Sequence, residues 1–168
     1  MSSKLYKLIF AQHHTTHSVR WIWKSKCTPR LKIFMWLLQA DRLNTRNMLR
    51  RRGHPQFQQP DQCVCVLCHR EEETRDHLFF DCIFSKRCWR LLNIHWQQHQ
   101  MVHIRIERAK ILYHQPFFME IFIIAAWEIW KIRNGQIFDN KWPTLQLWVL
   151  NFREQIFLHL HRVPDGLR

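Results

Sequence analysis

Glycine is scarce in this chain, with only Gly53, Gly135 and Gly166 in a length of 168 residues. Tight hairpin turns depend on glycine, so its scarcity disfavours a sheet assembled from hairpins. Hydrophobic residues make up 46% of the sequence, and nine residues are tryptophan, which supplies enough apolar material for a core. The composition therefore predicts a mainly α fold.

The sequence also lacks a long uninterrupted apolar segment. Residues 117–132 come closest, but a helix that spans a bilayer needs about 20 apolar residues. Glu120 and Glu128 lie inside this stretch, and each would be costly at the centre of a bilayer. We therefore predict a buried helix here and no membrane contact.

A secretion signal is also missing from residues 1–21. This stretch has no long apolar centre and no small-residue cleavage site, both of which a signal peptide needs. The sequence thus predicts an intracellular protein, in the nucleus or the cytoplasm, that is not secreted. Structural disulfides are unfavourable inside cells, where cysteines more often bind metals.

Acidic residues are outnumbered: 13 Asp and Glu face 26 Lys and Arg, which gives a net charge of +13. Such a balance attracts polyanions, of which nucleic acid is the commonest. Two other interpretations stay open, a basic surface that only confers solubility and a piece of a larger protein whose acidic part is missing.

The sequence shows no nucleophile–base pair, phosphate loop or open metal site, so we predict neither an enzyme nor a small-molecule substrate.

Helical periodicity and capping residues account for most of the chain. Thr28 is a suitable N-cap and Pro29 a suitable first residue for one helix, and Gly53 is a suitable end for another that starts near Thr45. We expect residues 53–62, with Pro55 and Pro60, to form a loop. The first helix would bury Leu31, Phe34, Met35 and Leu38. Further helices are predicted over about 83–94, 116–134 and 143–161, and a short helix or strand over 4–10.

Four of the six cysteines and two histidines fall in the stretch "CVCVLCHREEETRDHLFFDC", residues 63–82. Cys65 and Cys68 form a C-x2-C pair, which can supply two thiolates from one tight turn. His77 and Cys82 complete a Cys3His set, the kind of tetrahedral donor set that Zn²⁺ prefers. Because all four positions are filled by protein, such a site is structural and has no opening for a substrate.

The H-x4-C spacing needs a local distortion. Residues five apart on an ideal helix point about 140° away from each other, so His77 and Cys82 can share an ion only if the helix begins or bends near His77. Asp76 is the predicted N-cap. Cys63 is the main rival ligand, since it can replace Cys65 or stay free, while His69 and Cys88 are weaker rivals.

Several motifs together resemble the zinc-binding domain near the C-terminus of plant non-LTR (LINE-type) retrotransposon reverse transcriptases. They include the proline and "K-x-x-x-F-x-W"-like helix around Lys32 and Trp36, the "R-L-x-T" step at 42–45, the C-x2-C turn, "H-L-F-x-x-C" at 77–82 and the closing Trp89. The resemblance covers about 3–95. The later "AAWEIWKIRNGQIFDNK" is similar to a helical segment that follows this domain in the same elements.

This resemblance implies that Cys65, Cys68, His77 and Cys82 bind Zn²⁺ in a non-catalytic domain. It also implies a division into a zinc-binding domain over 3–95, a linker over 96–115 and a helical extension over 116–168. The chain contains neither a polymerase segment with paired aspartates nor an RNase H carboxylate set. We therefore expect an isolated retroelement remnant, or a free-standing gene product derived from one.

Two functions follow from the sequence. The first is nucleic-acid binding through basic residues on the predicted helices, with exposed tryptophans stacking on unpaired bases; Trp36 and Trp89 are expected in the core. The alternative is a structural or protein-interaction zinc module, which the acidic "REEETRD" loop favours because acids repel phosphate. The candidate nucleic-acid-binding residues are Arg46, Arg50, Arg51, Arg52, Lys86, Arg87 and Arg90.

Overall fold

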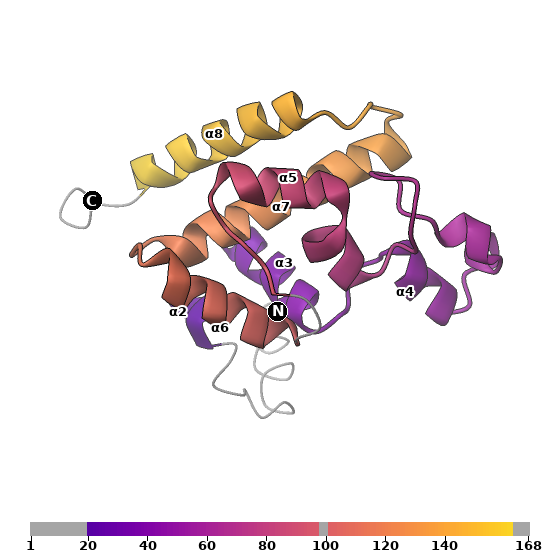
Figure 1. The fold of residues 1–168 in the computed structure, drawn as a ribbon, viewed down its shortest axis with the longest axis horizontal. Coiled ribbons are helices and arrows are strands. Elements are labelled where there is room, and N and C mark those ends of the chain that lie inside the picture. The colour runs from indigo at the N-terminus through magenta and orange to yellow at the C-terminus, as the bar shows by residue number, and fades with distance from the viewer. Residues whose placement is uncertain (1–19, 98–100, 163–168) are drawn as a thin grey trace, which may run out of the picture.

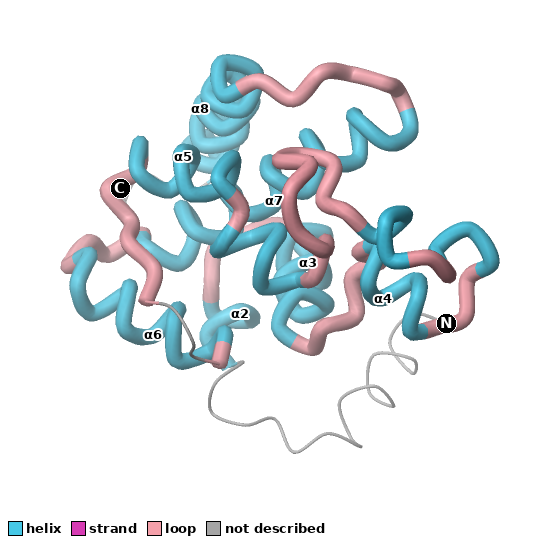
Figure 2. The backbone as a smooth tube through the Cα atoms, turned by 45° about the vertical axis from the view of Figure 1, so that its right-hand side comes forward, coloured by secondary structure: helices cyan, strands magenta, loops and turns pink. Residues whose placement is uncertain are grey.

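The structure is a computed structural model that describes residues 20–97 and 101–162. The element predicted over 4–10 lies outside the described residues, as does most of the N-terminal stretch. Within the described residues the chain forms helices and no strand, and its one sheet-like pairing is an isolated bridge between Val64 and Glu72. This confirms the mainly α fold (Figures 1 and 2). The α-helices are α2 (Arg20–Lys24), α3 (Pro29–Gln39), α4 (Arg46–Arg51), α5 (Ile83–Leu91), α6 (Val102–Tyr113), α7 (Phe118–Phe138) and α8 (Leu145–Arg162).

Helices α3 and α4 begin where their capping residues predict. Thr28 is the N-cap of α3 and is followed by Pro29 at the first helical position. Thr45 caps α4 by accepting a hydrogen bond from the backbone N–H of Met48, and Gly53 closes that helix in the left-handed conformation at φ +74°, which glycine adopts without strain. All four residues of the predicted apolar stripe on α3 are buried: Leu31, Phe34, Met35 and Leu38.

Two short 3-10 helices occupy the region predicted as loop after Gly53. They run over Pro55–Phe57 and Pro60–Cys63. Each starts at a proline, whose fixed φ suits the first position of a helical turn. The expectation that these prolines prevent regular structure was therefore wrong: each one starts a single tight turn.

Helix α7 is the central element of the fold. It contacts α3, α5, α6 and α8, and Figure 1 shows it crossing the molecule beneath α5 and α8. Its N-terminal carboxylate Glu120 accepts a hydrogen bond from the backbone N–H of Lys26 at 2.9 Å. The helix continues four residues past Asn134 to Phe138, because Gly135 is tolerated inside a helix at a cost of about 1 kcal/mol. No helix of the described residues is long and apolar enough to cross a membrane.

Helix α6 lies inside the stretch predicted to be a linker, residues 96–115. It buries Val102, Ile106 and Ala109 on one face. Its Arg105, also buried, lies 3.4 Å from Asp81 and 5.3 Å from the centre of the Phe80 ring. The stretch predicted to be a linker thus contains a helix that packs on the body of the protein. The division into domains stays a prediction.

The hydrophobic core is continuous from α2 to α8. It includes residues next to the cysteine cluster, such as Leu78 and Phe79, as well as Phe122 of α7 and Trp148 of α8. The Trp148 Nε1–H donates to the Ala125 carbonyl at 3.3 Å. The C-terminal helices therefore pack on the part of the chain that carries the cysteines, a point that the sequence had left open.

Candidate metal centre

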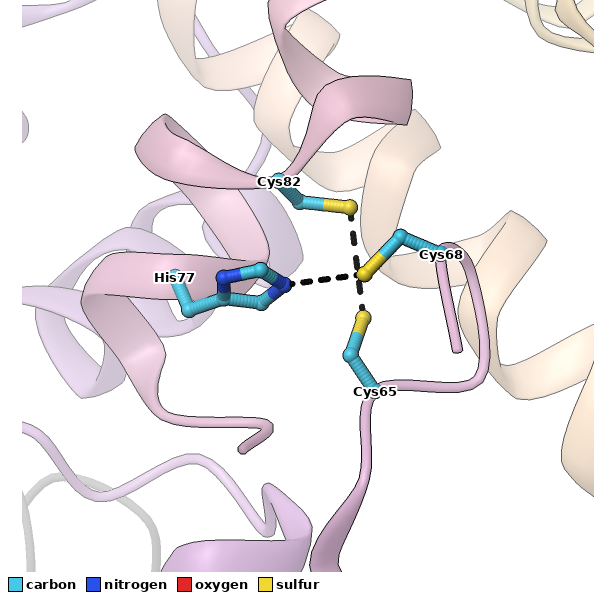
Figure 3. A group of neighbouring side chains, drawn as sticks. All are labelled: Cys65, Cys68, His77 and Cys82. Atoms are coloured by element: carbon cyan, nitrogen blue, oxygen red, sulfur yellow. Dashed lines mark hydrogen bonds between the residues drawn. The ribbon is translucent and has the colours of Figure 1, made fainter. Parts of the chain in front are cut away.

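The C-x2-C pair lies in a short hairpin-like loop. The Cys65 N–H donates to the Glu71 carbonyl at 2.8 Å, and the His69 N–H donates to the Cys65 carbonyl at 2.8 Å. His69 takes a left-handed conformation at φ 54°, which turns the chain back after Cys68. These bonds close a tight bend with the Cys65 and Cys68 thiols on its inner side (Figure 3).

The second pair lies on a π-helical turn, His77–Asp81. Its defining bond runs from the Cys82 N–H to the His77 carbonyl at 2.7 Å, and it joins residues five apart. One wide turn thus brings His77 and Cys82 to the same side, which an α-helix could not do. The predicted bend near His77 is this π turn.

The predicted N-cap of this helix was wrong. Asp76 has helical backbone angles and makes no capping bond. Thr74 takes that role: its hydroxyl accepts from the His77 N–H at 3.0 Å, and its carbonyl accepts from the Leu78 N–H. The helix therefore starts two residues earlier than expected, and the cap acts directly on the backbone of His77.

The four side chains converge on one point (Figure 3). One ligand atom from each of Cys65, Cys68, His77 and Cys82 lies within 4.8 Å of the other three. The Sγ atoms of Cys65 and Cys82 are 3.9 Å apart, and Cys68 Sγ is 3.2 Å from His77 Nε2. Two sulfurs on one tetrahedral Zn²⁺ would be about 3.8 Å apart and a sulfur and nitrogen about 3.6 Å. The group therefore fits the ion with shifts below about 1 Å.

Hydrogen bonds within the group perturb its ionisation. The hydrogen bond from the Cys65 thiol is the main cause that lowers the pKa of Cys82 to about 4. Hydrogen bonds from His77 and from the N–H groups of Phe84 and Ser85 act in the same direction. The bond between the Cys65 and Cys82 thiols, with burial, raises the pKa of Cys65. Burial would lower the pKa of His77, but bonds to Cys82 and Cys68 raise it to about 9. A thiolate at the first turn of α5 is the species that binds metals.

The site is closed to solvent on most sides. Cys65 and Cys82 are fully buried and His77 is 6% exposed, whereas Cys68 is half-buried. Glu71 Oε2 lies 3.3 Å from His77 Nδ1, although the geometry is not that of a hydrogen bond. A carboxylate in this position orients a metal-binding imidazole in many sites.

The rival ligands lie outside this group. The Cys63 thiol is buried and lies 3.5 Å from the Phe57 carbonyl, and burial raises its pKa. His69 is exposed on the far end of the loop. Cys88 is buried in α5, where burial raises the pKa of its thiol. Cys63 and Cys88 therefore behave as packed structural thiols in this fold.

A helical domain with a buried Cys3His group positioned for a metal ion is the class of protein that this structure defines. A family model described as zinc-binding in reverse transcriptase matches residues 1–89, which is more than half of the 168 residues. The chain belongs to this zinc-binding family, as its motifs predicted. Comparisons with curated proteins and with solved structures gave no match.

The acidic loop is bound to the protein itself. Glu73 is fully buried, accepts from the Arg46 N–H at 3.0 Å and pairs with Arg133 of α7 at 2.6 Å. Glu72 pairs with Arg50 at 2.7 Å and accepts from Asn47. Only Glu71 of the three glutamates is largely exposed. The loop is thus a link between the metal site, α4 and α7, and its repulsion of phosphate is weaker than the sequence suggested.

The seven predicted nucleic-acid-binding residues fall into two groups. Those of α4 have partners: Arg46 donates to the Val64 carbonyl, Arg50 pairs with Glu72, Arg51 pairs with Asp41, and Arg52 donates to Asn44. Those of α5 differ. Arg87 and Arg90 are exposed, Lys86 is half-buried, and no ion pair joins any of them to another described residue.

Sequence reasoning missed two contributors to the site. Thr74 had a usable signal, a threonine three residues before His77, but Asp76 directly precedes His77 and is also a favourable N-cap residue. The Glu73–Arg133 pair had none, because its members lie 60 residues apart and a single sequence carries no information on such pairing.

Proposed function

We propose that Cys65, Cys68, His77 and Cys82 hold one Zn²⁺ as a structural site. The observation that carries this proposal is the convergence of their four ligand atoms within 4.8 Å in a mostly buried position. Four protein ligands complete a tetrahedral zinc and leave no position for a reacting water. The ion would organise the loop, the π turn and the start of α5, and the domain would be non-catalytic.

Two neighbouring cysteines provide a matched test of this site. Cys63, at the end of the 3-10 helix Pro60–Cys63, and Cys65, two residues later, are both fully buried, but only Cys65 belongs to the converging group. We expect elemental analysis to find one zinc per chain in the wild type and in Cys63→Ser, and none in Cys65→Ser. Equal zinc content in the two variants would reject this ligand set.

We also propose that the protein binds nucleic acid through its basic surface, with Arg87, Arg90 and Lys86 as the main contacts. The net charge of +13 supports this, as do the exposed positions of the two arginines. Cys82 is the N-cap residue of α5, so the metal site would fix the orientation of the helix that carries them. Contacts of this kind go to phosphates and confer affinity without sequence choice.

The arginines of α4 would contribute less. Arg51 and Asp41 form an ion pair whose side chains are 58% and 35% exposed, and such surface pairs contribute about 0–1 kcal/mol. A phosphate can therefore replace Asp41. Arg50 and Arg52 can exchange partners in the same way, whereas the partner of Arg46 is a neutral group, the Val64 carbonyl.

Salt titration tests the nucleic-acid proposal. We expect wild-type affinity for a short RNA or DNA duplex to fall steeply with salt. Replacing Arg87 and Arg90 together with Gln should reduce the slope of log K against log salt by about two. Lys110→Gln, an exposed charge on α6, is the control. Binding that ignores salt, or an equal effect of the control, would count against this surface.

A second candidate function is protein interaction, which an observation on α8 favours. Leu150, Phe157 and Leu160 on this helix are 56%, 62% and 45% exposed, and exposed apolar side chains gathered in one patch can mark a protein-interaction site. The test is a pull-down after nuclease treatment, with Leu150→Ser/Phe157→Ser as control. A partner kept by the wild type and lost by this variant would support the interaction role.

We infer further that the protein works inside cells, in the nucleus or the cytoplasm. Three of the six cysteines belong to the proposed zinc site, and none of the six is paired in a disulfide. Free thiols and zinc thiolates persist in reducing compartments. An origin in plant non-LTR elements, which the motifs suggest, is part of the same proposal. Fractionation of cells that express the tagged chain tests the location.

A further inference from the structure

A cavity of about 690 Å³ lies beside the metal loop. One wall is α4 with the 3-10 turn that follows it, the second is the tip of the metal loop, and the third is the C-terminal end of α7. Figure 1 shows α4 and the 3-10 turns at the right of the molecule, below the end of α7. Ligand pockets usually measure about 300–1,000 Å³, so this cavity has a suitable size.

The walls combine aromatic rings with cationic and amide groups. Phe57, Trp130 and Phe138 line the cavity. The guanidinium of Arg46 lies 6.0 Å from the centre of the Phe57 ring, and that of Arg133 lies 4.8 Å from Trp130. Among the described residues that line the cavity, none is acidic, although the chain contains 13 acidic residues. Such walls favour an anionic ligand that carries a flat ring.

The positive charge of the cavity comes chiefly from Arg46. Arg133 is neutralised by buried Glu73, at 2.6 Å. Arg46 donates through Nη1 to a neutral carbonyl, that of Val64, and no described carboxylate forms an ion pair with its guanidinium. Its charge is therefore available to a phosphate at the rim, next to the other arginines of α4.

We propose that this cavity receives an unpaired base of a single-stranded nucleic acid, with a neighbouring phosphate on Arg46. The proposal rests on the nucleic-acid binding proposed above and names the form of nucleic acid that would be preferred. Unpaired bases stack on aromatic side chains and on guanidinium planes. Bases within a duplex cannot enter, because they are stacked and paired inside the helix.

The metal site would control this cavity. Val66 and His69 line it, and they belong to the bend that Cys65 and Cys68 would anchor to the ion. Loss of the ion would release this wall. Single-strand preference should therefore depend on zinc more strongly than the phosphate contacts of Arg87 and Arg90, because α5 is also held by its own residues in the continuous core.

The test compares a labelled oligo(A) RNA with a duplex of the same length, using the full chain loaded with zinc. We expect tighter binding of the single strand. Phe57→Leu and Phe138→Leu remove rings while keeping apolar volume, and together they should weaken single-strand binding about five- to 100-fold and leave duplex binding unchanged. The control is Phe157→Leu, which removes a ring of α8 that is 62% exposed. It should change neither single-strand binding nor duplex binding.

The possible outcomes separate this proposal from the one beneath it. If no nucleic acid binds, both fail. If single strand and duplex bind equally, and the variant with both Phe57→Leu and Phe138→Leu changes neither affinity, only the cavity proposal fails. Zinc content and circular dichroism of each variant show that it is folded. As a second measurement, thiouridine-substituted RNA should crosslink to peptides containing Phe57, His69 or Trp130, and crosslinks found only on α5 would overturn the proposal.

Discussion

Residues 63–82 and helix α7 are similar in length but are stabilised by different interactions. Twelve of the 21 residues of α7 are buried, most of them aliphatic or aromatic, and burial of apolar surface stabilises about 25 cal/mol per Å². Residues 63–82 form one bridge, one tight bend and one π turn. These short elements have little regular structure of their own and depend on polar contacts and on the four converging ligands.

The difference teaches where each region is vulnerable. A helix held by many apolar contacts loses stability gradually when one contact is removed. A bend closed by a few directed bonds is more sensitive to the loss of one of them, although Leu78, Phe79 and Phe80 also anchor the π turn in the core. The Glu73–Arg133 pair joins the two regions, as do the ring contacts of Phe79 with Trp130 and of Phe80 with Phe122. The pair is the polar contact through which damage in one region can reach the other.

Removal of the metal should have the largest effect. Structural zinc contributes on the order of 10 kcal/mol to small zinc domains, and this free energy would act on residues 63–82 first. We expect hydrogen exchange with a strong chelator to accelerate across the loop and the π turn while α7 keeps its protection. Simultaneous loss of protection in α7 would show that the two regions unfold as one unit, and the comparison above would then be wrong.

Breaking the Glu73–Arg133 pair should have the next largest effect. Glu73→Gln leaves the charge of Arg133, which is 3% exposed, without its partner, and breaking such a buried pair costs about 3–5 kcal/mol. The adjacent Glu72→Gln is the matched control, because its pair with Arg50 is more than a third exposed on both sides and should cost at most about 1 kcal/mol. Urea denaturation measures both, and equal costs would contradict the role of Glu73.

These contrasts explain how much the sequence could predict. Helices α3 and α4 were predictable because their signals, Thr28 with Pro29 and Thr45 with Gly53, are local. The convergence of Cys65, Cys68, His77 and Cys82 was also predictable, since C-x2-C and H-x4-C are short-range spacings with few geometric solutions. The need for a bend at His77 followed from helix geometry alone.

The remainder depended on contacts between distant residues. The sequence did not show that the bend is a π turn capped by Thr74, or that the Leu78, Phe79 and Phe80 side chains of this turn pack into the core. Helix α6 was missed because its pattern is weakly amphipathic and its anchor, Arg105 on Asp81, joins segments that the sequence does not relate. The internal pairing of Glu72 and Glu73 changed the interpretation of the acidic loop, and no local pattern indicates it.

Two threonine N-caps, Thr74 and Thr144, allow a test with a smaller expected change in stability, because only one of them lies beside the metal site. Thr74 caps the helix that carries His77, and Thr144 caps α8 by accepting from the Leu147 N–H at 3.1 Å. Replacing either with Ala should cost about 1 kcal/mol of stability. Only Thr74→Ala should also weaken zinc binding, because it loosens the backbone of His77, a proposed ligand. Competition with a chromogenic chelator measures this, and equal zinc affinity in both variants would contradict it.

The smallest expected effect lies in α7, at Glu128. This residue is fully buried and lies 2.9 Å from Lys131, and burial raises its pKa above the ordinary 4.5. A raised folded-state pKa means that the folded protein binds the proton more tightly than the unfolded chain. The stability from this group is therefore complete at low pH and is lost as the pH rises through the elevated pKa.

Glu128→Gln removes this titration and should raise the melting temperature by a few degrees at neutral pH, with little gain in acid. Glu107→Gln, an exposed acid of α6, is the control and should leave the pH profile unchanged. A loss of stability in Glu128→Gln at neutral pH would mean that the pair with Lys131 outweighs the cost of burying the carboxylate. Helix α7 would then share the dependence on polar pairs that characterises residues 63–82.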